Sequence, residues 1–189
     1  MILNMKQIIL IRHAKVDIES SKKMYSSSLK DWVDAYDKAD IDTDSLPTQK
    51  TRDRVNNATV LVTSTLSRAI ESAEVLGVDI YESNALFNEA KIPEINIPFL
   101  KFKPNRWLVI LRVLTLFGFA KTDTSLKASK LQAKKGSKRL LALSKNNDTV
   151  VLVGHGAMNW LLRKELMKEG WTLTEDPCNK NWGMTILTV

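Results

Sequence analysis

The sequence predicts an α/β fold built on a mainly parallel sheet, and three observations lead to this expectation. Apolar runs of strand length recur along the 189 residues. Segments with apolar residues at helical spacing lie between these runs. No internal repeat or low-complexity linker divides the chain, and its hydrophobic content of 44% is enough for a sizeable core. We therefore expect a single domain over residues 1–189.

The predicted strands are short and rich in aliphatic or β-branched residues, as buried strands are. The clearest ones are Gln7 to Ile11, Thr59 to Thr63 and Thr149 to Val153. Weaker patterns predict a strand at Val78 to Tyr81 and a closing strand at Thr185 to Val189. Strands that alternate with helices favour a parallel arrangement.

Three helices are predicted between and after these strands. Leu29 to Ala39 carries large apolar side chains at helical spacing and is expected to be amphipathic. Ser67 to Leu76 ends at Gly77, and Ala157 to Glu169 ends at Gly170. Glycine adopts the left-handed conformation of a helix C-cap at little cost, so both glycines mark helix ends.

A fourth helical segment, Trp107 to Phe119, is apolar on nearly all sides. Such a pattern indicates a buried helix or one that contacts a lipid-like surface. About thirteen residues, interrupted by Arg112, are too few to span a bilayer of about 30 Å at 1.5 Å per residue. A core, lid or dimer-interface helix and a helix resting on a membrane surface remain the alternatives.

The charge of the chain is unevenly distributed. Its net charge is +7, yet the segment from Lys101 to Lys145 holds twelve cationic residues and one anionic residue, Asp123. This asymmetry suggests an anionic partner or substrate, or else a solvated surface. A nucleic-acid partner is not expected, because the basic segment lacks interleaved aromatic residues and a known reading motif. The single cysteine, Cys178, and the lack of an evident signal peptide favour a cytoplasmic location.

The candidate functional residues follow the predicted strands, where the loops of α/β sheets carry ligand sites. Arg12 and His13 follow the first strand, Ser64 and Arg68 the second, and His155 the third. These include the only two histidines of the chain. Guanidinium and imidazole groups at one sheet edge would suit a tetrahedral oxyanion such as phosphate. Otherwise the arginines pair with surface carboxylates and the histidines are packing residues.

Three sequence blocks resemble the signatures of the histidine phosphatase superfamily, of the phosphoglycerate mutase-like branch 1 type. They are RHA at 12–14, STLSRAIESA at 64–73 and GHG at 154–156, and their order and spacing match over nearly the whole chain. The resemblance implies a three-layer sandwich with a central, mainly parallel sheet flanked by helices. It implies a phosphatase (phosphoric monoester hydrolase) that needs no metal or cofactor and forms a phosphohistidine.

The resemblance also implies the role of each site residue. His13 is expected to be the nucleophile, neutral when it attacks and kept so by the arginines around it. Arg12, Arg68 and His155 are expected to bind the phosphate. A general acid is expected after the strand that follows the second block, in a Leu-x-Glu context. The segment LFNEAKIPEINIP offers Glu89 and Glu94, and Glu89 fits this context better.

Two positions depart from the family pattern, which usually has glycine at Ala14 and often proline at Thr65. Neither change removes a reacting group, and Thr65 is expected to lose only a rigid turn former. A basic and apolar insertion at about residues 95–135 is expected near the active site.

The substrate stays open among small phosphorylated molecules, phosphoproteins and lipid phosphates, and so does the oligomeric state. The alternatives to hydrolysis are a phosphate-binding scaffold with little or no turnover and a phosphoglycerate mutase-like phosphotransferase.

Overall fold

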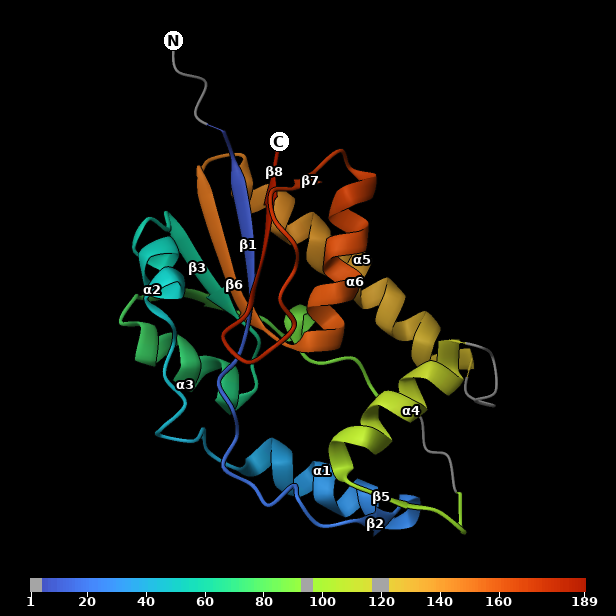
Figure 1. Ribbon diagram of the computed structural model, residues 1–189. Helices are drawn as coiled ribbons and strands as arrows, with labels where there is room; N and C mark the ends of the chain where they lie inside the picture. Colours follow the sequence, from blue (N-terminus) through green and yellow to red (C-terminus); the bar gives the residue numbers. More distant parts are fainter. Residues whose placement is uncertain (1–4, 93–96, 117–122) are drawn as a thin grey trace.

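The computed structural model describes residues 5–92, 97–116 and 123–189. Its central sheet has six strands in the order β4-β3-β6-β1-β8-β7 (Figure 1). The strands of this sheet are β1 Gln7–Arg12, β3 Val60–Thr63, β4 Ile80–Ser83, β6 Thr149–Gly154, β7 Thr172–Leu173 and β8 Met184–Thr188. The first four strands in this order, β4, β3, β6 and β1, are parallel, while β8 pairs antiparallel with both β1 and β7. The mainly parallel sheet predicted from the sequence is confirmed.

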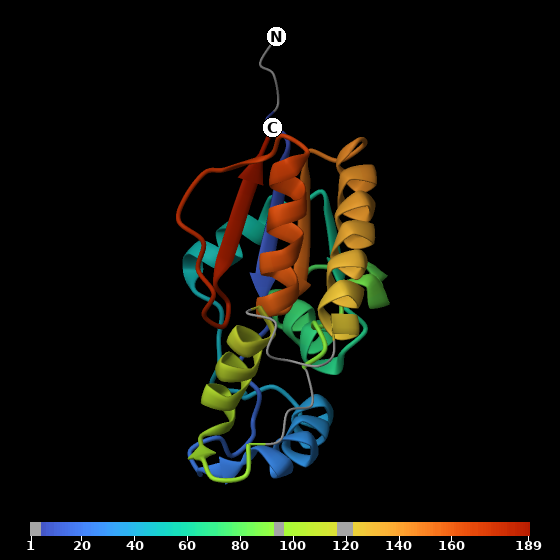
Figure 2. The same ribbon diagram turned by 90° about the vertical axis from the view of Figure 1, so that its right-hand side faces the viewer.

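Helices cover both faces of the sheet and complete a three-layer sandwich (Figures 1 and 2). On one face lie α2, Gln49–Asn56, and α3, Ser67–Leu76. On the other lie α5, Asp123–Ser144, and α6, Gly156–Lys168. The two core layers follow from the strand period of two residues, which sends successive side chains of β1 to opposite faces. Ile8 packs toward α5 and α6, whereas its neighbour Ile9 packs toward α2 and α3.

A third group of elements lies beyond the carboxyl ends of the parallel strands (Figures 1 and 2). We call it the cap: helix α1, Leu29–Lys38, helix α4, Pro104–Leu116, and a two-stranded ribbon of β2, Met24–Tyr25, and β5, Lys101–Phe102. The cap has its own apolar cluster, centred on the buried residues Leu29, Trp32, Trp107 and Leu111. Two short 3-10 helices complete the list of elements, η1 Ser26–Ser28 and η2 Ala85–Phe87.

Most predicted elements form within one or two residues of the expected positions. Helix α3 has the predicted bounds, and Gly77 and Gly170 adopt positive φ angles of 72° and 90°. The apolar helix begins at Pro104, three residues before the predicted start, because proline suits the first position of a helix. Its predicted end, Phe117 to Phe119, lies outside the described residues.

Two helices, α2 and α5, were not predicted from the sequence. In α5 the buried residues Ala133, Leu140 and Leu143 are separated by many lysines and small residues, so its apolar face is weak. Among the described helices, none combines the length and apolar character that crossing a bilayer requires.

Candidate active site

The topology brings the candidate residues to one edge of the sheet. Arg12 is the last residue of β1 and His13 follows it, while β6 leads directly into His155 at the N-cap of α6. Strand β3 leads into Ser64, and Arg68 is the second residue of α3. Because β6 lies between β3 and β1, these loops are neighbours, and the rings of His13 and His155 are 5.1 Å apart between centroids.

His13 is buried, and its hydrogen bonding defines its tautomer. Its Nδ1 lies 2.6 Å from the carbonyl oxygen of Ala14, which can only accept, so Nδ1 donates and Nε2 keeps its lone pair. Burial holds the pKa of His13 well below its usual value, and the charges of His155, Arg68 and Arg12 act in the same direction. A neutral His13 was expected from the arginines, but burial makes the larger contribution.

Several buried nitrogen atoms at this edge have no hydrogen-bond partner in the part of the chain that the structure describes. They are Arg12 Nε, Arg68 Nε and His155 Nδ1, three of the five such side-chain atoms found there. A buried donor without a partner costs about 1–3 kcal/mol. A bound oxyanion would provide the missing acceptors, so these atoms fit a phosphate site.

Ser64 orients the second histidine. Its Oγ lies 2.7 Å from His155 Nε2 and accepts the backbone N–H of Leu66 at 3.3 Å. When the Ser64 hydroxyl donates to Nε2, the ring hydrogen of neutral His155 is on Nδ1, as a donor to an oxyanion requires. Burial, followed by Arg68, Arg12 and Arg112, holds the pKa of His155 well below its usual value. The sequence placed Ser64 after the strand without giving it this role.

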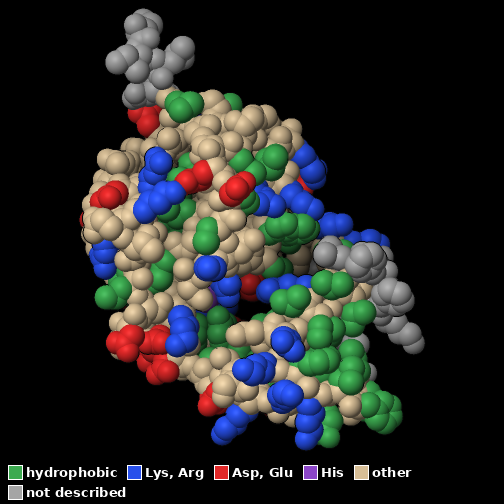
Figure 3. All heavy atoms as spheres, in the orientation of Figure 1, with side chains coloured by type: hydrophobic (Ala, Val, Ile, Leu, Met, Phe, Trp, Pro, Cys, Tyr) green, Lys and Arg blue, Asp and Glu red, His purple; other side chains and the backbone are tan. Residues whose placement is uncertain are grey.

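The loop before β8 supports Arg12 and His13. Arg12 Nη1 donates to the carbonyl oxygen of Asn179 at 2.9 Å, and Asn181 Nδ2 donates to the carbonyl oxygen of His13 at 2.9 Å. A pocket of about 940 Å³ opens beside Arg12, and residues of this loop line it together with Lys15 and Ser45. Figure 3 shows a hollow between the sheet and the cap, with Lys and Arg side chains at its border.

Helix α1 of the cap contacts Arg68, which is 2% exposed. Asp37 Oδ1 accepts from Arg68 Nη1 at 2.8 Å, and the guanidinium carbon lies 4.9 Å from the centroid of the Tyr36 ring. Sequence reasoning missed these two residues as members of the site. Their only signal was the amphipathic pattern of α1, which says nothing of what the helix contacts.

Glu89 lies at the N-terminus of α6. Its carboxylate accepts the backbone N–H groups of Met158 at 3.0 Å and Ala157 at 3.4 Å, and it pairs with Arg112 of α4 at 3.1 Å. The alternative acid, Glu94, lies outside the described residues.

Thr65 does more than replace a turn former, which corrects the expectation from the sequence. Its backbone N–H and its Oγ1 both donate to Asn88 Oδ1, at 2.9 and 3.0 Å. Proline has no N–H and could not make the first of these bonds. Thr65 thereby ties the second block to the residue before Glu89.

Ala14 fits its position without strain. Trp182, at φ 60°, is the one non-glycine residue with positive φ in the described chain, so Ala14 does not need the conformational freedom of glycine. Its methyl group is buried in the core layer under α2 and α3, and its N–H donates to Ser72 Oγ at 2.9 Å. Within the described ranges, no group of three or more His, Cys, Asp or Glu residues is placed to hold a metal ion.

Comparison with solved structures supports the fold. No protein-family model matches the sequence, and no curated protein matches it. Among solved structures, the chain is similar to phosphoserine phosphatase from Entamoeba histolytica in complex with 3-phosphoglyceric acid, with 19% identity and a TM-score of 0.54 over 98% of this chain and 94% of that one. A mutant of the same enzyme in complex with phosphoserine also has 19% identity and a TM-score of 0.54, over 96% and 90% of the chains.

A further similar structure, mycobacterial hydrolase 1, has 15% identity and a TM-score of 0.59 over 97% of this chain and 91% of that one. Identities this low show a shared fold. The phosphoglycerate mutase-like fold that the three sequence blocks implied is therefore confirmed.

Proposed function

We propose that the protein is a metal-independent phosphomonoester hydrolase of the histidine phosphatase superfamily that works through a phosphohistidine at His13. One observation carries the proposal: a buried, neutral histidine with a free Nε2 lies in a site where Arg12, Arg68 and His155 have donors without partners. The shared fold with a phosphatase solved in complex with phosphorylated compounds supports it.

In the first step, His13 Nε2 attacks the phosphorus atom, forming a P–N bond while the P–O bond to the leaving alcohol breaks. Arg12, Arg68 and His155 stabilise the charge on the non-bridging oxygens, and removing one preorganised donor of this kind typically costs about 3 kcal/mol. The protonated carboxyl of Glu89 transfers its proton to the leaving oxygen.

In the second step, water attacks the phosphohistidine and the Glu89 carboxylate takes a proton from it. The P–N bond breaks, inorganic phosphate leaves and His13 regains its lone pair. The hydrogen bond from Nδ1 to the Ala14 carbonyl holds the ring in one tautomer throughout the cycle. Thr65 and Asn88 hold the loop that carries Glu89.

The natural substrate is expected to be a small phosphorylated compound, and the chemical group that carries the phosphate is left open. Arg112, on the leaving-group side beside Glu89, is about one-third exposed and could pair with an anionic substituent of the substrate. A panel should therefore include phosphoserine, 3-phosphoglycerate, sugar phosphates, nucleotides and a lipid phosphate. Conversion of 3-phosphoglycerate to its isomer would instead favour the mutase-like alternative.

His13→Ala tests the nucleophile. We expect hydrolysis of p-nitrophenyl phosphate to fall by more than about 10³-fold, because the phosphoryl acceptor is lost. Wild-type activity should persist with EDTA, and brief reaction with labelled substrate should leave an acid-labile, base-stable phosphate on the wild-type protein alone. Normal turnover by folded His13→Ala, or label on a serine, would refute the mechanism. Phosphate binding without turnover in the wild type would favour the scaffold alternative.

A further inference from the structure

Tyr36 of α1 reaches from the cap to the phosphate-binding groups. Its ring packs edge-on against His13, with centroids 6.4 Å apart and planes at 64°. The guanidinium of Arg68 lies over the same ring, 4.9 Å from its centroid. Tyr36 therefore contacts both the proposed nucleophile and one of the proposed phosphate ligands.

The cap holds this tyrosine in place. Its ring stacks on Trp32, one turn earlier in α1, with centroids 5.1 Å apart and planes at 29°. Trp32 is itself part of the buried cap cluster, and its Nε1 donates to the carbonyl oxygen of Glu19 at 2.9 Å. The next residue, Asp37, pairs with Arg68 at 2.8 Å. The position of Tyr36 is thus fixed by Trp32 within the cap and by the Asp37–Arg68 ion pair at the site.

The surroundings of the phenol define its protonation state. Burial raises the pKa of Tyr36, while Arg68 and Arg12 oppose that effect and Glu89 adds to it. The hydroxyl stays protonated at neutral pH and is a hydrogen-bond donor. Arg12, Arg68 and Glu89 all act on the hydroxyl electrostatically, and these are the groups assigned above to the phosphoryl group and the leaving oxygen.

We propose that Tyr36 is a substrate-contacting residue whose ring closes the phosphate pocket over His13 and whose hydroxyl donates a hydrogen bond to the phosphoryl group. The inference rests on the proposed phosphate site, and it extends that site from the sheet edge to the cap. A hydroxyl that donates to an anion makes one of the stronger hydrogen bonds in proteins. The ring limits access of water to His13 from the side of the cap.

Tyr36→Phe tests the hydroxyl, and the chain offers a matched control. Tyr81 on β4 is 66% exposed, so Tyr81→Phe removes the same atom away from the site. Binding of inorganic phosphate and of orthovanadate is measured by calorimetry, and kcat/KM is measured with p-nitrophenyl phosphate. We expect Tyr36→Phe to weaken both anions and to lower kcat/KM by about tenfold, because one hydrogen bond to a charged group is lost. Tyr81→Phe should match the wild type.

Tyr36→Ala tests the ring and should cause a larger loss than Tyr36→Phe in both measurements. Thermal unfolding checks that each variant is folded. Wild-type anion affinity in Tyr36→Phe would overturn the proposed hydrogen bond, and wild-type kcat/KM in Tyr36→Ala would overturn the role of the ring. If the wild-type protein binds phosphate in a Tyr36-dependent way but hydrolyses nothing, the contact stands and the proposed hydrolase function fails. If the wild-type protein binds neither anion, both proposals fail.

Discussion

The two histidines of the site differ in the hydrogen bonds that hold their imidazole rings. His13 donates a hydrogen bond from Nδ1 to the Ala14 carbonyl oxygen and keeps a lone pair on Nε2. His155 has its Nε2 2.7 Å from the Ser64 hydroxyl, and its buried Nδ1 has no hydrogen-bond partner among the described residues. Two side chains of the same type, both with lowered pKa values, therefore have different hydrogen-bonding environments, which fit the nucleophile and donor roles that we propose for them. Small neutral partners from neighbouring loops are enough to make this distinction.

Glu89→Gln tests the general acid at this scale. The amide keeps the shape of the carboxyl but cannot transfer a proton, and general acid catalysis typically contributes 10²–10⁴-fold. We expect kcat/KM for alkyl phosphates to fall by roughly 100-fold or more. The loss should be far smaller for p-nitrophenyl phosphate, whose phenolate leaves without a proton.

The matched control is Glu82→Gln, since Glu82 on β4 also pairs with an arginine, Arg139. It should affect both substrates little. Equal losses on the two substrates in Glu89→Gln would mean that Glu89 binds or packs without donating a proton. A selective loss in Glu94→Gln would assign the role to Glu94.

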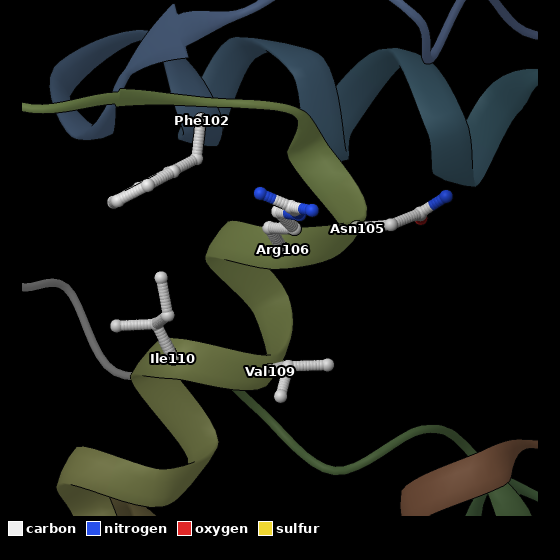
Figure 4. A pocket seen from close by; sticks show the side chains of 5 residues that line it. All are labelled: Phe102, Asn105, Arg106, Val109 and Ile110. Atoms are coloured by element: carbon white, nitrogen blue, oxygen red, sulfur yellow. The ribbon is translucent and has the colours of Figure 1, made fainter.

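At the scale of elements, α4 has two unlike sides. Trp107 and Leu111 are buried in the cap, whereas Val109 and Val113 are 59% and 44% exposed. A pocket of about 470 Å³ lies along the helix, lined by Phe102, Asn105, Arg106, Val109 and Ile110. Figure 4 shows Phe102 and Ile110 projecting to the same side of the ribbon, with Arg106 between them. The all-round apolar pattern in the sequence thus corresponds to one buried side and one exposed side.

The exposed side of α4 predicts salt-sensitive association with anionic vesicles, the membrane contact considered from the sequence. Phe99 is 90% exposed, and the exposed cations Lys101, Lys103 and Arg106 lie near it in the chain. Each cation near an anionic surface contributes about 1 kcal/mol. Co-sedimentation should show binding to vesicles with phosphatidylserine and none to neutral vesicles. Binding should weaken at about 0.5 M salt, because screening then shortens to roughly 4 Å.

The double substitution Val109→Asp and Val113→Asp should abolish this association. Leu131→Asp is the matched control, because Leu131 on α5 is 55% exposed and lies outside the cap. A wild-type protein that stays in the supernatant at low ionic strength would contradict the prediction and leave a lid or an oligomer interface as the role of α4.

At the scale of the whole molecule, sequence patterns predict what lies along strands and at their ends. The buried strands produce apolar runs, and the parallel arrangement places the residues after them at one edge, so His13, Arg68 and His155 could be expected to meet. The contacts of the cap could not be predicted in this way. Tyr36 meets His13, and Asp37 meets Arg68, through packing between segments that no local pattern relates.

The same limit explains two smaller differences. The hydrogen bond from the Thr65 N–H to Asn88 depends on a loop that follows the next strand. From the sequence alone, threonine in place of the family's proline therefore predicts only the loss of a rigid turn. Helix α5 is held by packing against α6 and the sheet, and its own pattern is dominated by lysines on the solvent side. Tertiary contacts decide both cases.

The two buried histidines also predict how the stability of the whole protein depends on pH. Both have pKa values held well below 6.5 in the folded state, and the chain contains no other histidine. Below about pH 6.5 the unfolded chain binds protons at these positions while the folded protein does not. The free energy of unfolding therefore decreases as pH falls from about 6.5 toward the folded-state pKa values, by up to about 1.4 kcal/mol per pH unit for each histidine.

Urea denaturation between pH 5.3 and 8 measures this dependence, in buffers without phosphate because a bound anion would stabilise the folded state. Carboxylates with lowered pKa values, such as Asp42 and Glu82, lose their stabilising contribution only at more acid pH, below about 4.5. His13→Asn should remove about half of the slope, since asparagine does not titrate, and the double variant with His155→Asn should be nearly flat above pH 5.3. A wild-type protein whose stability is constant over this range would show that the folded histidines titrate normally, and their neutral state at the site would then be wrong.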